Sequence, residues 1–172
     1  RTQYNMISVG TPYAWYGVPY AEGFETFGLT AAGWLVINED EANAWEHSTK
    51  AAYSGTSCIA LNNLKGNRAG LNDALISPSF SLSYTTSPEL SFRLACSQKT
   101  KTDADNLKIY TSSNCGQTWS LRNSISGSSL YTADPDTNPF IPKVDQWKEI
   151  KISLNTVAGK PMVRLKLEFN SD

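Results

Sequence analysis

Four segments in the second half of the sequence alternate strictly between apolar and polar residues, and this alternation constrains the fold more than any other feature. Residues 90–96, 106–112, 150–154 and 163–169 carry apolar side chains at every second position. Successive side chains of a β-strand point to opposite faces, so a period of two predicts strands that bury one face. Turn-forming Gly, Pro, Asn and Asp residues separate these segments.

The rest of the chain supports a fold built only from strands. No stretch of a dozen residues shows a helical stripe, and only 18% of the residues are charged, which is low for a long-helix bundle. The sequence therefore predicts an all-β, antiparallel, two-sheet jelly-roll sandwich. Residues 19–172 form this domain, with a short apolar strand at Gly33–Ile37. Residues 1–18 form a leader strand, Thr2–Val9, and a linker.

Charge and hydropathy exclude two classes of partner. The net charge is -1 and the 15 Lys and Arg residues are scattered, so little counterion release would favour a nucleic acid. No apolar run is long enough for a membrane span. The chain begins at Arg1 without a signal peptide and is expected to be a piece of a longer precursor.

Three cysteines leave at least one thiol without an intramolecular partner. Cys58, Cys96 and Cys115 lack metal-type spacing. If residues 90–96 and 106–112 form a hairpin, Cys96 and Cys115 lie near opposite ends of it. Their Cα atoms would then be farther apart than the roughly 7 Å that a disulfide allows. The sequence thus argues against this bridge and leaves the pairing of Cys58 open.

Catalytic motifs are scarce. His47 is the single histidine, and neither a G-x-S-x-G elbow nor an H-E-x-x-H helix is present. We therefore expect His47 to be an exposed loop or strand residue rather than a catalytic base. A pair of carboxylates could still act as in glycosidases, and the acids of residues 38–41 and 103–105 represent this hydrolase alternative.

One motif predicts a specific turn. Residues 112–119 follow the pattern S-x-D-x-G-x-T-W with Asn114 in place of Asp, and this resembles the Asp-box hairpin turn of sialidases and other β-proteins. We expect Asn114 to cap the turn amides, Gly116 to adopt a left-handed conformation and Trp119 to fold over the hairpin. The role of such a turn is structural.

Two acidic segments resemble calcium loops only in part. Residues 134–138 offer oxygen side chains at alternate positions, but Pro139 occupies the glycine position and Asp145 the position of the bidentate Glu. A plain Asp-Pro turn accounts for this segment. For residues 103–105, a solvated hairpin loop suffices.

The five tryptophans and eight tyrosines either fill a core or form platforms for sugar rings. Trp34 and Trp119 are expected in the core because they lie within strand or hairpin patterns. Trp45 follows a loop and is expected to be exposed.

Several short phrases, taken in order over residues 19–169, resemble the MAM-like and galactose-binding-like jelly-roll domains of secreted Bacteroidetes proteins. Similar domains include the cleaved-adhesin modules of gingipains and modules that follow pappalysin-type zinc metallopeptidase domains, often behind a PKD domain. The phrases are Pro19–Tyr20, Phe24–Glu25, Gly33–Trp34, Trp45–Glu46, Ser54–Gly55, Asp73–Pro78, Leu90–Phe92, Asp105–Tyr110, Cys115–Trp119, Trp147–Lys148 and Ala158–Lys160.

The resemblance implies a role in adhesion, substrate targeting or domain packing, without an active site, in a secreted or cell-surface protein. It implies a structural Ca²⁺ ion held by the Glu25 carboxylate and by the backbone carbonyl of Ser54; the alternative for Glu25 is an ordinary exposed strand carboxylate. Family members continue into a final strand that carries paired aspartates. This chain is expected to lack that strand, through truncation or because a partner adds one. Residues 1–18 would end a PKD-like domain.

The resemblance therefore implies a non-catalytic accessory or adhesion module of a larger bacterial protein. The expected parent protein is a metallopeptidase. Its expected partners are other domains of the same precursor and a protein or glycan ligand. The alternative is a carbohydrate-binding module that uses exposed aromatic side chains.

Overall fold

The computed structural model describes residues 15–26, 28–38, 43–62 and 72–171. Apart from three single-turn 3-10 helices, the regular elements of these residues are strands. None of their helices is long and apolar enough to cross a membrane. The strands are β1 (Trp15–Tyr16), β2 (Leu35–Asn38), β3 (Glu46–Ser48), β4 (Cys58–Ala60), β5 (Asn72–Ile76), β6 (Ser79–Phe80), β7 (Glu89–Leu94), β8 (Asn106–Ser112), β9 (Ser120–Ser126), β10 (Lys148–Ser153) and β11 (Arg164–Asn170).

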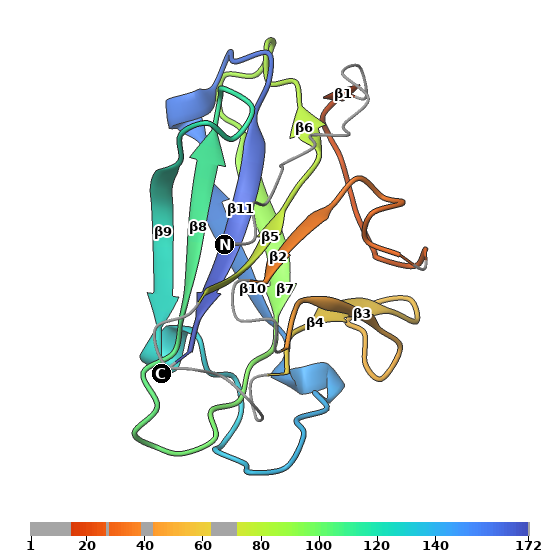
Figure 1. Cartoon of the computed structure of the whole chain (residues 1–172), viewed down its shortest axis with the longest axis vertical. Coiled ribbons are helices and arrows are strands. Elements are labelled where there is room, and N and C mark those ends of the chain that lie inside the picture. The colour runs from red at the N-terminus through yellow and green to blue at the C-terminus, as the bar shows by residue number, and fades with distance from the viewer. Residues whose placement is uncertain (1–14, 27, 39–42, 63–71, 172) are drawn as a thin grey trace, which may run out of the picture.

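A five-stranded antiparallel sheet forms one layer, in the order β2-β5-β11-β8-β9. Strand β11 pairs with β5 on one side and with β8 on the other, so that Leu167 lies opposite both Leu75 and Ile109. The β8–β9 hairpin contains a register shift after Ile109. This sheet faces the viewer in Figure 1.

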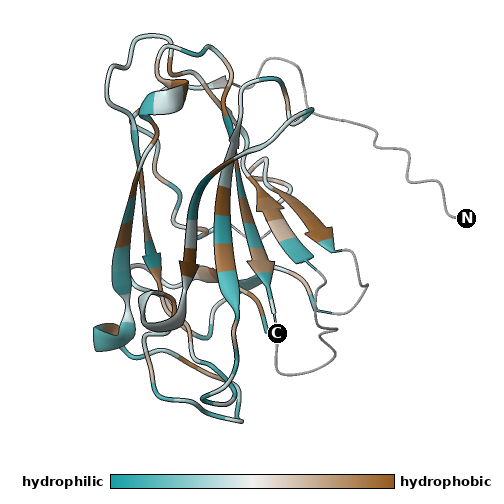
Figure 2. Ribbon diagram, turned by 90° about the vertical axis from the view of Figure 1, so that its left-hand side faces the viewer, coloured by the Kyte–Doolittle hydropathy of each residue, from teal (hydrophilic) through white to brown (hydrophobic). Residues whose placement is uncertain are grey.

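The second layer contains the antiparallel pair β7–β10, in which Phe92 lies opposite Ile150 and Arg93 opposite Glu149. In Figure 1 this pair lies behind the large sheet, and Figure 2 shows the two layers side by side. The antiparallel β3–β4 hairpin and the short parallel pair β1–β6 complete the strand pairing. The 3-10 helices are η1 (Gly127–Ser129), η2 (Val144–Gln146) and η3 (Asn155–Val157).

The predicted alternation appears as buried faces of these strands. Figure 2 shows hydrophobic and hydrophilic bands succeeding one another along them. Strand β8 spans residues 106–112 as expected, with its odd-numbered residues from Leu107 to Thr111 buried. The side chains that share the core are Phe80, Leu82, Leu107, Ile109, Ile125, Leu130, Ile150, Ile152, Leu154, Val157, Val163, Leu165 and Phe169. The prediction of an antiparallel two-sheet sandwich is confirmed.

The pairing of residues 90–96 with residues 106–112 was wrong. Strand β7 pairs with β10, whereas β8 pairs with β9 and β11 in the other sheet. Alternation shows which face of a strand is buried but not which strand lies beside it, because every strand of a sandwich carries the same pattern. Cys58, Cys96 and Cys115 are all free thiols, so the conclusion against a Cys96–Cys115 bridge holds although its premise fails.

The N-terminal part of the described chain packs against the sandwich. Strand β1 pairs with β6, and the ring of Tyr16 lies 5.0 Å from that of Tyr20. The expected strand at residues 33–37 is β2, and Trp34 before it is buried at 8% exposure. The expected leader strand at residues 2–9 lies outside the described residues.

The packing between the layers gives a direct test. Ile109 is fully buried on the inner face of β8, whereas Leu121 on β9 is 52% exposed. We expect Ile109→Ala to lower the free energy of unfolding by about 2–5 kcal/mol through lost apolar contacts and a residual cavity. The matched control Leu121→Ala should change it by no more than about 0.5 kcal/mol. Urea titration followed by tryptophan fluorescence measures both, and equal effects would contradict the packing.

Candidate functional site

Residues 49–57, which we call the 49–57 loop, connect β3 to β4 and make a network of polar contacts outside the sheets. The carboxylate of Glu25 accepts hydrogen bonds from the Thr56 hydroxyl at 2.6 Å, from the Thr56 amide at 3.1 Å and from the Ser57 amide at 3.3 Å. Glu25 lies 31 residues upstream of Thr56, in an irregular segment between β1 and β2 rather than in a strand. One carboxylate thus ties the N-terminal segment to this loop.

The conformation and surroundings of position 55 explain why the Ser54–Gly55 segment has a glycine there. Its φ of +73° lies in the left-handed region, and a Cβ added there would collide with the Glu25 carboxylate. Both conditions favour glycine, because only glycine adopts this backbone conformation freely and leaves room for the carboxylate. The resemblance assigned Glu25 and the Ser54 carbonyl to one calcium site. The structure places the Glu25 carboxylate against Thr56 and Ser57 of the same loop, and the calcium site itself stays a prediction.

The hydrogen bonds make this carboxyl group more acidic. The Thr56 side chain and amide, then the Ser57 amide, favour the ionised form and lower the pKa of Glu25 below its ordinary value of 4.5. His47 contributes a smaller electrostatic effect, which also lowers the pKa of Glu25. Glu25 is therefore ionised at neutral pH and provides a fixed negative charge beside the loop.

The chemistry of this site fits a Ca²⁺ ion only in part. Calcium takes six to eight oxygen ligands, and the site brings one carboxylate next to the loop that holds the Ser54 carbonyl. Amide and hydroxyl donors of Thr56 and Ser57 already occupy both carboxylate oxygens. Within the described ranges, no three His, Cys, Asp or Glu side chains gather in a metal-binding cluster.

A second contact anchors the opposite side of the 49–57 loop. The guanidinium of Arg93 lies over the Tyr53 ring, 4.4 Å from its centroid. The ring of Trp147, which follows η2, meets Tyr53 edge-on with centroids 6.5 Å apart. The loop is thus held by a charge-assisted hydrogen-bond network at Thr56 and by a cation–π and aromatic contact at Tyr53.

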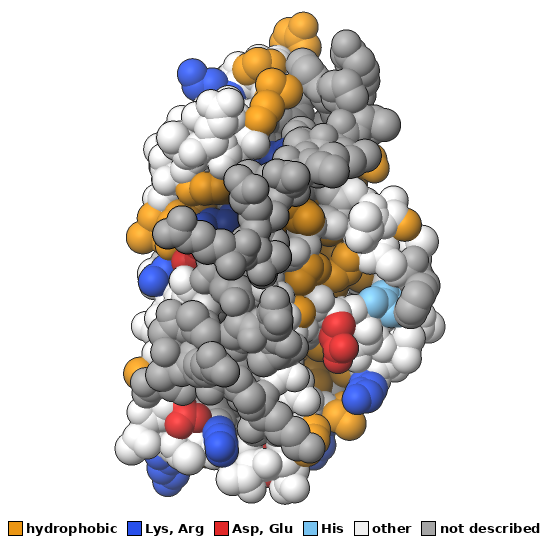
Figure 3. Space-filling model, viewed as in Figure 1, with side chains coloured by type: hydrophobic (Ala, Val, Ile, Leu, Met, Phe, Trp, Pro, Cys, Tyr) orange, Lys and Arg blue, Asp and Glu red, His pale blue; other side chains and the backbone are white. Residues whose placement is uncertain are grey.

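Charged side chains continue from Tyr53 along the outer face of the β7–β10 pair. Arg93 lies 3.5 Å from Glu149, and Glu149 lies 3.9 Å from Lys151. On the opposite layer, Lys166 lies over Tyr110 and bonds Glu168 at 2.6 Å. Figure 3 shows Lys, Arg, Asp and Glu side chains interspersed on the face it displays rather than gathered by sign.

Two of the aromatic predictions need correction. Trp45 is half-buried instead of exposed, and its indole N–H donates to the carbonyl of Asp73 at 3.1 Å. Trp119 is half-buried instead of belonging to the core, and the ammonium group of Lys166 lies 5.5 Å from its ring. The outward-facing Lys166 places Trp119 over the outer face of the sheet, a position that hairpin spacing alone does not reveal.

The predicted Asp-box turn is confirmed. The side-chain oxygen of Asn114 accepts hydrogen bonds from the Thr118 amide at 3.0 Å and the Ser112 hydroxyl at 2.8 Å. Gly116 has a φ of +86°, and the Trp119 ring lies where a Cβ on Gly116 would meet it at 3.3 Å. The motif closes the β8–β9 hairpin and serves a structural role.

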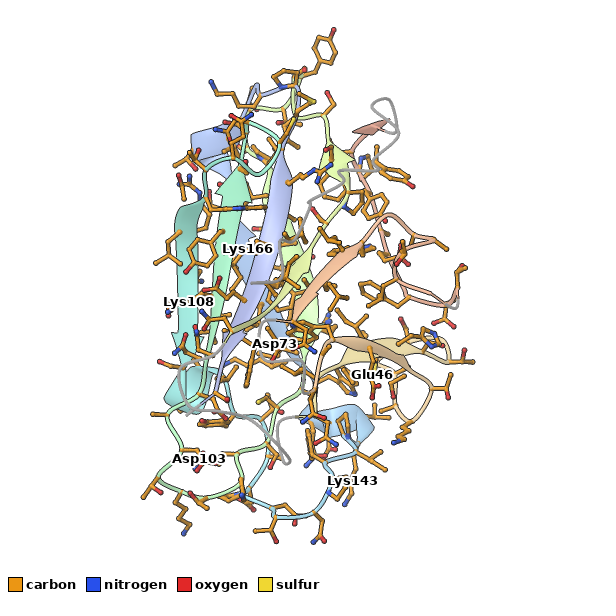
Figure 4. The ribbon with its side chains drawn as sticks, viewed as in Figure 1. Glu46, Asp73, Asp103, Lys108, Lys143 and Lys166 are labelled. Atoms are coloured by element: carbon orange, nitrogen blue, oxygen red, sulfur yellow. The ribbon has the colours of Figure 1, made fainter. Side chains whose placement is uncertain are left out.

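The acidic loops behave differently from one another. Asp103 accepts amide hydrogen bonds from Lys99 at 2.8 Å and Thr100 at 2.9 Å, as expected for an exposed turn. Asp105, however, is buried at 2% exposure, so the expectation of a solvated loop is wrong for this residue. Asp136 accepts a bond from the Asn138 amide at 2.8 Å, which is the local geometry of a turn. Figure 4 shows Asp103 far from Glu46 and Asp73.

The hydrolase alternative would need a cleft that joins His47 to converging acids. His47 is half-buried in β3. A groove of about 260 Å³ lies instead between β9 and β10, with Asn123, Ser129 and Lys151 among its lining residues. Residues 39–41 of the alternative lie outside the described residues.

The two packed antiparallel layers form a β-sandwich whose fold is similar to that of cleaved adhesin domains and of carbohydrate-binding modules. Among the most similar solved structures is the K1 cleaved adhesin domain of Lys-gingipain from Porphyromonas gingivalis W83, with 19% identity, a TM-score of 0.56 and coverage of 87% of this chain and 93% of that domain. The K2 domain of Lys-gingipain shows 16% identity, a TM-score of 0.53 and coverage of 88% and 96%.

A third structure, of promiscuous carbohydrate-binding modules from the β-sandwich superfamily, shows 12% identity and a TM-score of 0.53, and covers 84% of this chain but 54% of its own. At these identities the likeness is one of fold. No protein-family model and no curated protein matches the sequence.

The contacts of Glu25 predict a pH dependence of stability. Because folding lowers the pKa of Glu25, its contribution is present above its ordinary value of 4.5 and is lost as pH falls through the lowered pKa. We expect Glu25→Gln to melt at a lower temperature than the wild type at pH 7, and this difference should shrink below pH 4. Other acids with lowered pKa, such as Asp103, are common to both proteins and cancel. A melting-temperature difference that stays constant from pH 7 to pH 3 would contradict a stabilising role for the ionised Glu25 carboxylate.

Proposed function

We propose that this chain is a non-catalytic binding module of a larger secreted or surface-attached bacterial protein, in which it contributes adhesion and domain packing. The observation that carries this proposal is the fold match to the K1 cleaved adhesin domain over nearly the whole of both chains. The match to the K2 domain supports the same assignment. The organised loop beside β3 and β4, rather than a catalytic cleft, is the feature that a binding role would use.

A carbohydrate ligand is the second candidate, and two observations favour it. The sandwich is shared with a module whose described function is carbohydrate binding. Three tyrosines expose a large part of their side chains, namely Tyr16 at 38%, Tyr53 at 46% and Tyr84 at 101%. Exposed aromatic rings are the groups on which sugar rings stack.

The parent protein in this proposal is a zinc metallopeptidase. Its support is the series of short phrases shared with modules that follow pappalysin-type domains. Sequencing the whole precursor tests this part: an H-E-x-x-H helix motif upstream of Arg1 supports it, because such a helix supplies zinc ligands and the catalytic Glu. A precursor without a peptidase domain contradicts it.

We also propose that Ca²⁺ binds through the Glu25 carboxylate and the Ser54 carbonyl. The same Glu25 oxygens accept hydrogen bonds from Thr56 and Ser57, so ion and donors would compete for them. Calcium would replace part of this network. Either the bound ion or the hydrogen bonds to Glu25 would then hold this side of the 49–57 loop.

Binding without turnover is the direct test of the module assignment. We expect the purified chain to be retained by at least one member of a panel of immobilised extracellular glycans and matrix proteins, and to hydrolyse neither peptides nor glycosides. The variant Asp103→Asn, which changes the acid of the exposed turn, should bind like the wild type. Hydrolysis that this variant abolishes would support the hydrolase alternative and contradict the proposal.

Calcium gives an independent test. A ligand that binds only the folded state raises the melting temperature with its concentration. We expect added Ca²⁺ to raise the melting temperature of the wild type, a chelator to reverse the rise, and Glu25→Gln to show no response. If the wild type melts at the same temperature in calcium and in chelator, the ion site is wrong. The hydrogen bonds of Glu25 with Thr56 and Ser57 would be unaffected by that result.

A further inference from the structure

The outer face of the β7–β10 pair, together with the 49–57 loop, presents a connected row of exposed and half-buried side chains. We call it the Tyr53 surface, and it comprises Trp147, Tyr53, Arg93, Glu149 and Lys151. Each contacts the next: the Trp147 and Tyr53 ring centroids are 6.5 Å apart, the Arg93 guanidinium lies 4.4 Å from the Tyr53 centroid, and the ion-pair distances are 3.5 and 3.9 Å. It mixes aromatic, cationic and anionic groups on one accessible face.

The side chains of the Tyr53 surface are more exposed than those of an ion pair that only supports the fold. Tyr53 is 46% exposed, and the side chains of Arg93, Glu149 and Lys151 are 36%, 42% and 56% exposed. The comparable group on the opposite layer, Lys166 with Glu168, is only 17% and 13% exposed. Solvent-exposed ion pairs stabilise a fold little, so the row on β7 and β10 remains available for a ligand.

The charges of the Tyr53 surface favour an anionic ligand. Arg93 and Lys151 share the carboxylate of Glu149, so these three groups together carry one net positive charge. An Arg guanidinium binds a carboxylate through two parallel hydrogen bonds. Arg93 is already oriented by the Tyr53 ring, 4.4 Å from its centroid, so little side-chain freedom would be lost on binding.

The aromatic residue defines the rest of the ligand. The exposed part of the Tyr53 ring can stack against the C–H face of a sugar, and Glu149 can accept hydrogen bonds from its hydroxyl groups. A pyranose that carries a carboxylate meets all of these groups at once. We infer that the Tyr53 surface binds an acidic glycan, with the sugar ring on Tyr53 and its carboxylate at Arg93 and Lys151. This inference rests on the proposed binding function and specifies its ligand.

Affinity electrophoresis in gels that contain hyaluronan, which carries uronate groups, tests the inference; gels with neutral β-glucan provide the comparison. We expect retardation by hyaluronan only, weakening as salt screens the charges. Loss of one charge-assisted bond weakens binding at least about tenfold, so we expect this loss for Arg93→Met. Tyr53→Ala removes the ring on which the sugar stacks, and we expect it to weaken binding as well. Lys101→Met is the matched control for the charge, because Lys101 is exposed and lies outside the row.

One further variant separates loss of binding from loss of stability. Tyr53→Phe keeps the ring that holds the loop, so it should bind within about threefold of the wild type and melt at the same temperature. Equal hyaluronan binding by Tyr53→Ala and the wild type overturns the site, and equal binding of neutral glucan overturns the acidic ligand. If only an immobilised protein retains the chain, the glycan inference fails while the binding function stands. If no glycan or protein retains it, both fail.

Discussion

The inner faces of two sheets pack against each other, and every other feature of this molecule depends on that contact. Strand β8 turns Leu107 and Ile109 toward the core, and β10 turns Ile150 and Ile152 toward the same cluster. Burial of apolar surface is the dominant favourable contribution to folding. Each strand that contributes to it must present its polar residues outward, so the same alternation that makes the core also places Arg93, Glu149 and Lys166 on the surface.

The loops inherit their positions from this packing. The β3–β4 hairpin places the 49–57 loop between the N-terminal segment and the β7–β10 pair, and two unrelated contacts hold it there. Glu25 binds one side through amide and hydroxyl donors, and Arg93 covers Tyr53 on the other. A change at either contact is therefore expected to reach the other through a loop of nine residues.

The sequence predicted the strands well because their signal is local. Residues 106–112 alternate without interruption and form β8, and the Asp-box motif specifies its own turn through Asn114 and Gly116. Strand partners could not be predicted, because alternation carries no information about neighbours. The hairpin considered for residues 90–96 and 106–112 therefore does not form, and β7 pairs with β10. Burial of Asp105 and Trp45 also depends on elements far away in the sequence, namely Tyr131 and Asp73.

The candidate site was predictable only where a resemblance supplied it. The resemblance assigned Glu25 and Ser54 to one site, and the structure places Glu25 against Gly55, Thr56 and Ser57 of that loop; the role of the two residues as calcium ligands stays a prediction. The Tyr53 surface has no sequence motif, because Arg93 and Trp147 meet Tyr53 only after the sandwich closes. Its one local signal is the polar outward register of residues 89–93 and 149–153.

Cross-strand nuclear Overhauser effects test the central claim, that β7 and β10 form the second layer against the five-stranded sheet. The register predicts contacts between the backbone protons of Phe92 and Ile150, and of Arg93 and Glu149. Contacts between residues 89–94 and 106–112 as neighbouring strands would contradict it. Such contacts would show that neither the packed core nor the Tyr53 surface forms as described.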